Sequence, residues 1–191
     1  MTDSLTVRDF RPEDREDIRR ICRETCSDPF LLKNEDVLFG KYADYYMNEE
    51  PELICILADQ NGRAQGYILC SADPDLYISR WREFYLSEIR GHGPVNILLQ
   101  VHTLWEVQHM AKKGYSAHLH IDISPAYQHA GGGTLLTDAL RKKLRSRGIS
   151  GLYLGCAEAN AAGMRFYRHY GFSVHHRYPG GTVFTIKTER M

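Results

Sequence analysis

Three consecutive glycines, Gly131 to Gly133, separate two segments of different periodicity. Residues 117–124 alternate between apolar and polar side chains, the period of a strand with one polar face, and Pro125 ends them. Residues 135–144 instead carry leucines and an alanine at helical spacing. The glycines remove every Cβ from the place where a ligand would approach the backbone, and the first helical amides are left unpaired. This order predicts a phosphate-binding turn; a permissive turn without a ligand is the alternative.

Two well-known nucleotide-binding turns fit this segment poorly. A dinucleotide-binding turn requires G-x-G-x-x-G and a later acidic residue at a strand end. A Walker loop requires a lysine between its last glycine and a Ser or Thr, whereas Thr134 follows Gly133 directly. The glycine turn is therefore expected to hold a phosphate of another kind.

The periodicity of the remaining chain predicts an α/β domain around one mixed sheet. The expected strands cover residues 5–10, 53–58, 66–70, 117–124, 151–156, 172–178 and 182–187. The expected helices cover about 12–25, 35–47, 95–113, 134–147 and 161–170. Residues 73–114 are less regular, contain a Gly91-His92-Gly93-Pro94 break and are interpreted as an insertion over the core. Residues 1–191 are expected to form a single domain.

Composition narrows the class of protein. Basic and acidic residues number 24 each, so no overall field draws the chain toward nucleic acid or an anionic membrane. No apolar run approaches the roughly 20 residues that span a bilayer, and the N-terminal residues do not resemble a signal peptide. Five scattered cysteines favour reduced thiols, and Cys22 and Cys26 have no second pair at zinc spacing. We expect a cytoplasmic monomer or homodimer with no metal, nucleic-acid or membrane partner.

The glycine turn resembles the acetyl-CoA motif of the GNAT superfamily of N-acetyltransferases. That motif, Q/R-x-x-G-x-G/A, lies between the fourth strand and the third helix of the family. Here it is matched by Gln128-x-x-Gly131-x-Gly133.

A second family pattern, N-x-x-A/G-x-x-F-Y-x-x-x-G-F, follows downstream at the family's usual separation. The matching residues are Asn160, Gly163, Phe166, Tyr167, Gly171 and Phe172. The resemblance covers most of the chain outside residues 73–114. Within the family, residues 117–125 and the preceding insertion look most like bacterial proteins similar to the acetyltransferase-like domain of O-GlcNAc hydrolases.

The resemblance implies a mostly antiparallel mixed sheet whose fourth strand splays away from the fifth. Acetyl-CoA (CoA) would lie between them, with its pantetheine paired to the fourth strand and its pyrophosphate at the glycine turn. The cofactor-binding residues implied are Ile121, Ile123, Gln128, His129, Ala130, Gly131, Gly132, Gly133, Thr134, Asn160, Gly163, Phe166 and Tyr167.

The resemblance also implies a direct transfer of acetyl to a primary amine through a tetrahedral intermediate. The backbone amide of Ile123 would face the acetyl oxygen, and Tyr167 would be the general acid that protonates the departing sulfur. A plain core tyrosine is the alternative for Tyr167.

The general base is less clearly marked. Asp122 is the first candidate and His120 the second, since both share the polar strand face with His118, and Glu158 at the end of the fifth strand is a further one. The glutamate that the histone-modifying branch carries early in this strand is missing here. Asp122 could instead fix the turn, and His118 with His120 would need a third ligand to bind a metal.

The amine acceptor, a small molecule or a peptide, is expected to be selected by the insertion and the first two helices. Residues 80–85 mix cations with aromatic rings and could hold an anionic or sugar-like acceptor, or simply form an amphipathic lid. The function that follows is acetyl-CoA-dependent N-acetyltransferase. A catalytically inactive acetyl-CoA-binding or protein-interaction module is the alternative.

Overall fold

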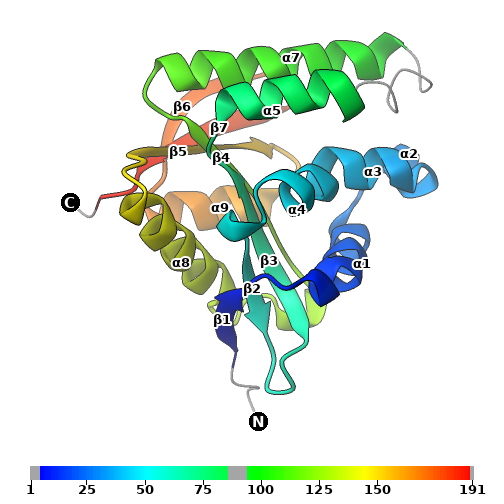
Figure 1. The fold of residues 1–191 in the computed structure, drawn as a ribbon, viewed down its shortest axis with the longest axis vertical. Helices are drawn as coiled ribbons and strands as arrows, with labels where there is room; N and C mark the ends of the chain where they lie inside the picture. Colours follow the sequence, from blue (N-terminus) through cyan, green and yellow to red (C-terminus); the bar gives the residue numbers. More distant parts are fainter. Residues whose placement is uncertain (1–4, 86–93, 190–191) are drawn as a thin grey trace.

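One mixed sheet organises the part of the chain that the computed structural model describes, residues 5–85 and 94–189 (Figure 1). Its strand order is β1-β2-β3-β4-β5-β7-β6. All neighbouring strands are antiparallel except β4 and β5, which are parallel. The strands are β1 Thr6–Asp9, β2 Cys55–Ala58, β3 Ala64–Ser71, β4 Ala117–Ile123, β5 Gly151–Ala157, β6 Ser173–Tyr178 and β7 Gly181–Lys187. The predicted mixed, mostly antiparallel α/β sheet is confirmed.

Helices connect and cover these strands. The longer ones are α1 Arg15–Thr25, α7 Pro94–Lys112, α8 Gly132–Ser146 and α9 Ala161–Tyr170. The shorter α-helices are α2 Pro29–Lys33, α3 Glu35–Phe39, α4 Tyr45–Glu49 and α5 Pro74–Arg80. Segments of π-helix, η2 Gly40–Asp44 and η4 Trp81–Tyr85, follow α3 and α5, and short 3-10 turns are η1 Pro12–Asp14, η3 Pro51–Leu53 and η5 Pro125–Tyr127.

The neighbouring strands β2 and β3 are buried on both faces, as their continuous apolar sequence predicts. Ile56 and Leu69 join a cluster with α1, α3 and α4 on one face, whereas Leu57 and Ile68 join a cluster with α8 and α9 on the other. Figure 1 shows α1 and α8 on opposite sides of these strands. The sheet is therefore the middle layer between two groups of helices.

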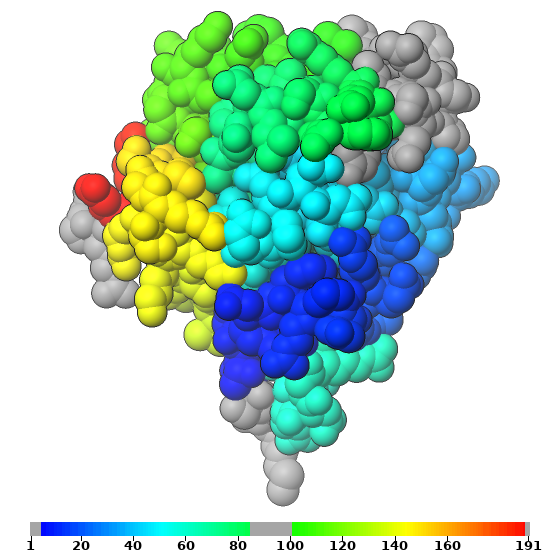
Figure 2. Space-filling view, viewed as in Figure 1, coloured from blue at the N-terminus to red at the C-terminus, as the bar shows by residue number. Residues whose placement is uncertain are grey.

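Residues of the predicted insertion pack over one of these groups. Helices α5 and α7 lie against each other at one end of the molecule (Figure 1). The buried side chains of Tyr77 in α5, Trp81 at the start of η4, and Leu104 and Val107 in α7 belong to the same apolar cluster as α1, α3 and α4. In Figure 2 the green surface of this segment continues into the cyan surface below it without a break.

Several predicted boundaries differ from the structure. The helix expected over 35–47 is α3, η2 and α4 in succession, and α2 and α5 lie in segments for which no helix was predicted. The helix expected over 95–113 is α7, whereas residues 91–93 of the predicted glycine break lie outside the described residues. In the ranges 5–85 and 94–189, none of the helices combines the length and apolar character needed to cross a bilayer.

Candidate active site

Strands β4 and β5 run together only at their beginnings. Their ladder joins Ala117 to Leu152 and His118 to Tyr153, and it includes no later residue of β4 within the described chain. On its other side β4 stays paired with β3 as far as Ile123. The sheet therefore opens into a wedge between its two parallel strands, as the resemblance implied.

The edge of β4 that faces this wedge presents free backbone groups. The amide of Ser124 donates to the carbonyl of Gln65 in β3 at 2.8 Å. Because hydrogen-bonding direction alternates along a strand, the backbone groups of Ile121 and Ile123 point to the opposite edge. The carbonyl of Ile123 accepts the side-chain amide of Gln128 there at 2.9 Å, so Gln128 fastens the turn to the strand. An extended ligand in the wedge would meet the remaining amides and carbonyl.

The glycine turn directly follows β4 and begins α8. His129 and Gly131 have left-handed backbone angles, with φ of 64° and 80°, and right-handed α8 starts at Gly132. A left-handed residue before a right-handed one turns successive amides toward a common concave side, an arrangement that binds anions. In the described chain, the amides of residues 131–133 donate to no backbone or side-chain acceptor. The turn thus has the geometry of an anion site at a helix N-terminus.

The three glycines are there for different reasons. A Cβ on Gly132 would lie 2.5 Å from Leu57 Cδ2, and a Cβ on Gly133 would lie 3.0 Å from the ring of Phe166. At both positions a Cβ would force a neighbouring side chain to shift, so glycine favours the close packing of α8. A Cβ on Gly131 would meet nothing within 4 Å, and only its left-handed φ restricts it. Gly131 is the position where the turn is open to a ligand.

The second sequence motif builds the start of α9 and brings it against the first. Asn160 caps the helix by accepting the amide of Gly163 at 2.8 Å, and a Cβ on Gly163 would collide with that side chain. One turn later, Phe166 lies over Gly133. The two motifs therefore touch, and Tyr167 is held next to their contact.

Tyr167 belongs to the apolar core and also lines a cavity of about 350 Å³. Its ring is 8% exposed and packs against Phe172 and Phe184, as expected of a core tyrosine. Its side chain nevertheless lines the cavity together with Asp122 and His120. No protein group in the described residues accepts a hydrogen bond from its hydroxyl, and burial raises its pKa, so the phenol stays protonated.

Asp122 and His120 form a polar pair in the same cavity. The Asp122 carboxylate accepts the hydroxyl of Tyr67 at 2.8 Å, and its Oδ2 lies 2.9 Å from Nε2 of His120. The His120 ring also stacks on Tyr42, with 4.9 Å between centroids. Burial lowers the pKa of His120, but the nearby Asp122 carboxylate outweighs this and raises it to about 10. At neutral pH the pair is an imidazolium beside a carboxylate.

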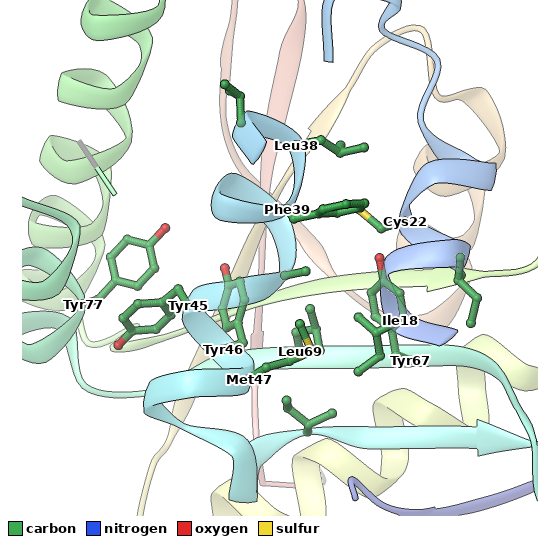
Figure 3. Close-up of a cluster of buried hydrophobic side chains, with 14 of the residues drawn as sticks. Ile18, Cys22, Leu38, Phe39, Tyr45, Tyr46, Met47, Tyr67, Leu69 and Tyr77 are labelled. Atoms are coloured by element: carbon green, nitrogen blue, oxygen red, sulfur yellow. The ribbon is translucent and has the colours of Figure 1, made fainter. Parts of the chain in front are cut away.

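Two members of this cluster were missed by sequence reasoning. Tyr67 extends from β3 toward α1, where Cys22 lies (Figure 3). Cys22, His120 and Asp122 each offer one ligand-type atom, and these atoms lie within 4.8 Å of one another. Cys22 is thus the third group that sequence reasoning could not find, and His118 is not part of the set. The prediction that the protein binds no metal stays a prediction.

Other predicted residues lie elsewhere. His118 is in a second cavity among aromatic rings, and Glu158 and Thr134 are exposed outside the Tyr167 cavity. Asp122 makes no bond to the glycine turn in the described chain, so it does not fix that turn. Arg80, one of the cations in the segment proposed to hold an anionic acceptor, is bound to Glu49 and Glu83 instead.

Comparison with known proteins agrees with this geometry. The model of the Acetyltransferase (GNAT) family matches residues 15–172. The crystal structure of SsHAT is similar over 98% of this chain and 100% of its own, with 28% identity and a TM-score of 0.82.

Two further solved structures share the fold. PaiA N-acetyltransferase from Thermoplasma acidophilum, in complex with coenzyme A, is 18% identical with a TM-score of 0.61, and the similarity covers 96% of this chain and 99% of that one. Ribosomal-protein-S18-alanine N-acetyltransferase from Escherichia coli is 16% identical with a TM-score of 0.59, over 98% and 96% of the two chains.

Proposed function

The chain belongs to the GNAT acetyltransferase family, whose members use acetyl-CoA, and from this premise we propose that it transfers acetyl directly to a primary amine. The observation that carries the proposal is the convergence of Tyr167 and Asp122 on one cavity beside the wedge between β4 and β5. A protonated phenol and a carboxylate are the two kinds of group that this reaction needs: one to give a proton and one to take it.

The residues around the wedge fit the cofactor. The unpaired amides of residues 131–133 are suited to the pyrophosphate, and the free backbone edge at Ile121 and Ile123 is suited to the pantetheine amides. When bound, acetyl-CoA supplies a thioester whose C–S bond breaks as the amide N–C bond forms. The amide of Ile123 is available to donate to the acetyl oxygen as that oxygen gains negative charge.

Tyr167 is the proposed general acid. Its hydroxyl proton is held firmly because burial raises the pKa of the phenol, and no protein acceptor in the described residues competes for it. The same desolvated surroundings raise the proton affinity of a thiolate, which is what makes transfer from Oη to sulfur feasible.

The His120–Asp122 pair is the proposed acceptor of the amine proton. Asp122 remains the first candidate because its carboxylate carries the negative charge, while His120 is already protonated at neutral pH. The two groups are 2.9 Å apart, so the amine proton reaches the pair directly or through one water.

The experiment is release of free thiol from acetyl-CoA across a panel of primary amines. We predict that Tyr167→Phe lowers kcat by about 100-fold or more and changes CoA affinity little, because the ring keeps its packing and only the proton donor is lost. Tyr170→Phe is the matched control, since Tyr170 lies on the same helix and its hydroxyl bonds Asp138 outside the cavity.

Two outcomes would contradict the proposal in different ways. Full activity of Tyr167→Phe would remove Tyr167 from the mechanism. Tight CoA binding with no turnover on any amine would favour the alternative, a catalytically inactive acetyl-CoA-binding or interaction module.

Finer assignments belong to the same proposal. We propose that residues 1–191 are one GNAT domain with residues 73–114 as an insertion, in a subgroup similar to the acetyltransferase-like domain of O-GlcNAc hydrolases. Cytoplasmic location is supported by five cysteines that are all free thiols.

A further inference from the structure

A second cavity, of about 330 Å³, adjoins the Tyr167 cavity at His120. Tyrosine and tryptophan side chains from six elements line it: Tyr42, Tyr46, Tyr77, Trp81, Tyr153 and Tyr178. The two cavities share His120, Tyr42, Gly155 and Ala157 as lining residues. A molecule in the second cavity therefore ends next to the His120–Asp122 pair.

Glu106 on α7 is the carboxylate of this cavity. Its neighbours include His102, Tyr153 and Tyr178. In the described chain no hydrogen bond or ion pair engages it, and burial raises its pKa while His102 lowers it. Glu106 is half-buried, and a carboxylate that is partly desolvated without a partner costs free energy unless a ligand supplies a cation or a donor.

His118 adds an unused polar group to the same cavity. The residue is 9% exposed, and neither ring nitrogen has a hydrogen-bond partner in the described chain. Its ring lies 4.5 Å from that of Tyr77 and 5.6 Å from that of Tyr153, centroid to centroid. Burial lowers its pKa to about 3, so it stays neutral and offers one acceptor nitrogen.

Charge differs between the two ends of the cavity. Lys41 lies 4.9 Å from the ring centroid of Tyr42, a residue that lines both cavities. A cation there favours the neutral form of an amine that is about to react. Glu106 lies among the residues that belong to the second cavity alone, where electron-rich aromatic faces also attract a cation.

We infer that this cavity is the acceptor subsite and that its preferred acceptor is an amine with a second cationic group, an α,ω-diamine. One ammonium would be held by Glu106, the aromatic walls and the acceptor nitrogen of His118, and the other amine would reach the His120–Asp122 pair. The inference rests on the proposed function for the reaction itself. An anionic acceptor has no free cation at the Glu106 end in the described residues.

The first experiment measures binding by calorimetry, with CoA present, using 1,4-diaminobutane and 1-aminopentane as probes. These molecules have the same number of heavy atoms and differ by one ammonium group. The wild-type chain should bind the diamine at least about tenfold more tightly, the factor that about 1.4 kcal/mol represents. Glu106→Gln should abolish this preference, because it keeps the side-chain shape and removes the charge.

Two variants complete the binding experiment. Glu52→Gln removes the same charge from an exposed position that lines neither cavity, and it should keep the full preference. Glu106→Asp keeps the charge on a shorter side chain and should retain part of the preference even if Glu106→Gln folds poorly. Equal affinity of the wild type for the two probes would overturn the inference.

Turnover separates this inference from the proposed function. The diamine should show the higher kcat/KM in the wild type, and Glu106→Gln should lower the ratio of the diamine kcat/KM to the 1-aminopentane kcat/KM about tenfold. Transfer to both amines with equal kcat/KM would overturn the diamine inference and leave the proposed function standing. A third outcome is diamine binding that depends on Glu106, with no acetyl transfer to any amine. It would overturn the proposed function and the assignment of this cavity as the acceptor subsite, and would leave only a cation-binding site.

Discussion

His118 and His120 lie two residues apart on the same face of β4, yet their surroundings are opposite. His118 is enclosed by the rings of Tyr46, Tyr77 and Tyr153 and meets no charge, so burial alone lowers its pKa to about 3. His120 is also desolvated, but the carboxylate of Asp122 raises its pKa to about 10. The position of one carboxylate therefore decides the protonation state.

This difference predicts two distinct histidine titrations. In nitrogen-detected NMR spectra, His118 should stay neutral from pH 5 to 9, and His120 should stay protonated until the pH exceeds about 9. Asp122→Asn should bring the pKa of His120 to 6.5 or lower, because burial then acts without an opposing charge. Asp138→Asn, the same change at an exposed site on α8, should leave both unchanged. A wild-type His120 that titrates near 6.5 would contradict the assignment.

Single residues of the site differ in how well sequence could predict them. Asp122 and His120 were predicted because strand alternation is local and puts them on one polar face. Tyr67 was not, because it is brought to Asp122 by the register of two strands that are 55 residues apart in sequence. Glu106 was missed because the residues that form the cavity around it come from other elements, far from it in sequence.

At the level of elements, the glycine turn combines packing with ligand access. Gly132 and Gly133 pack tightly against Leu57 and Phe166, so packing alone can explain glycine at these two positions. Gly131 alone is open on its Cβ side and left-handed. A test of the phosphate site therefore belongs at Gly131.

We predict that Gly131→Asp weakens CoA binding by about tenfold or more, since it adds a negative charge at the helix end that attracts the pyrophosphate. Gly131→Asn has the same shape and a similar backbone cost of about 1–2 kcal/mol, without the charge. Its loss of affinity should be clearly smaller. Calorimetry with CoA measures both.

A position control is available at the other end of α8. Gly148 is also left-handed and open, so Gly148→Asp carries the same charge and backbone cost away from the turn. It should leave CoA affinity unchanged. If Gly131→Asp bound CoA as tightly as Gly131→Asn, the turn would not hold an anionic group.

The two unpredicted helices carry a start signal that periodicity did not weigh. Both α2 and α5 begin at a proline that follows an aspartate, Asp28-Pro29 and Asp73-Pro74, and each aspartate accepts amides of the first turn. Aspartate at the N-cap with proline next is a strong helix start. Their five and seven residues are too few for an apolar stripe to stand out, so capping chemistry was the only local signal.

For the whole molecule, the same two histidines link folding to pH. Unfolded histidine has a pKa of about 6.5. Below this value His118 is protonated in the unfolded chain but stays neutral in the folded chain. The free energy of unfolding therefore falls as pH decreases toward 3. Above it the folded chain keeps a proton on His120 that the unfolded chain has lost, so the contribution of the His120–Asp122 pair is lost as pH rises toward 10.

These two effects predict a maximum of stability near pH 6.5, with each histidine contributing about 1.4 kcal/mol per pH unit on its own side. Urea unfolding at a series of pH values measures the slopes. His118→Gln should flatten the limb between pH 5 and 6.5, although Glu106, whose raised pKa acts in the opposite sense, then remains. His120→Gln should flatten the limb between pH 6.5 and 9, and exposed His175→Gln should change neither. The comparison uses the slope of the unfolding free energy against pH, so a loss of packing that is the same at every pH does not affect it. Unchanged slopes in both His118→Gln and His120→Gln would rule out the link between these histidines and stability.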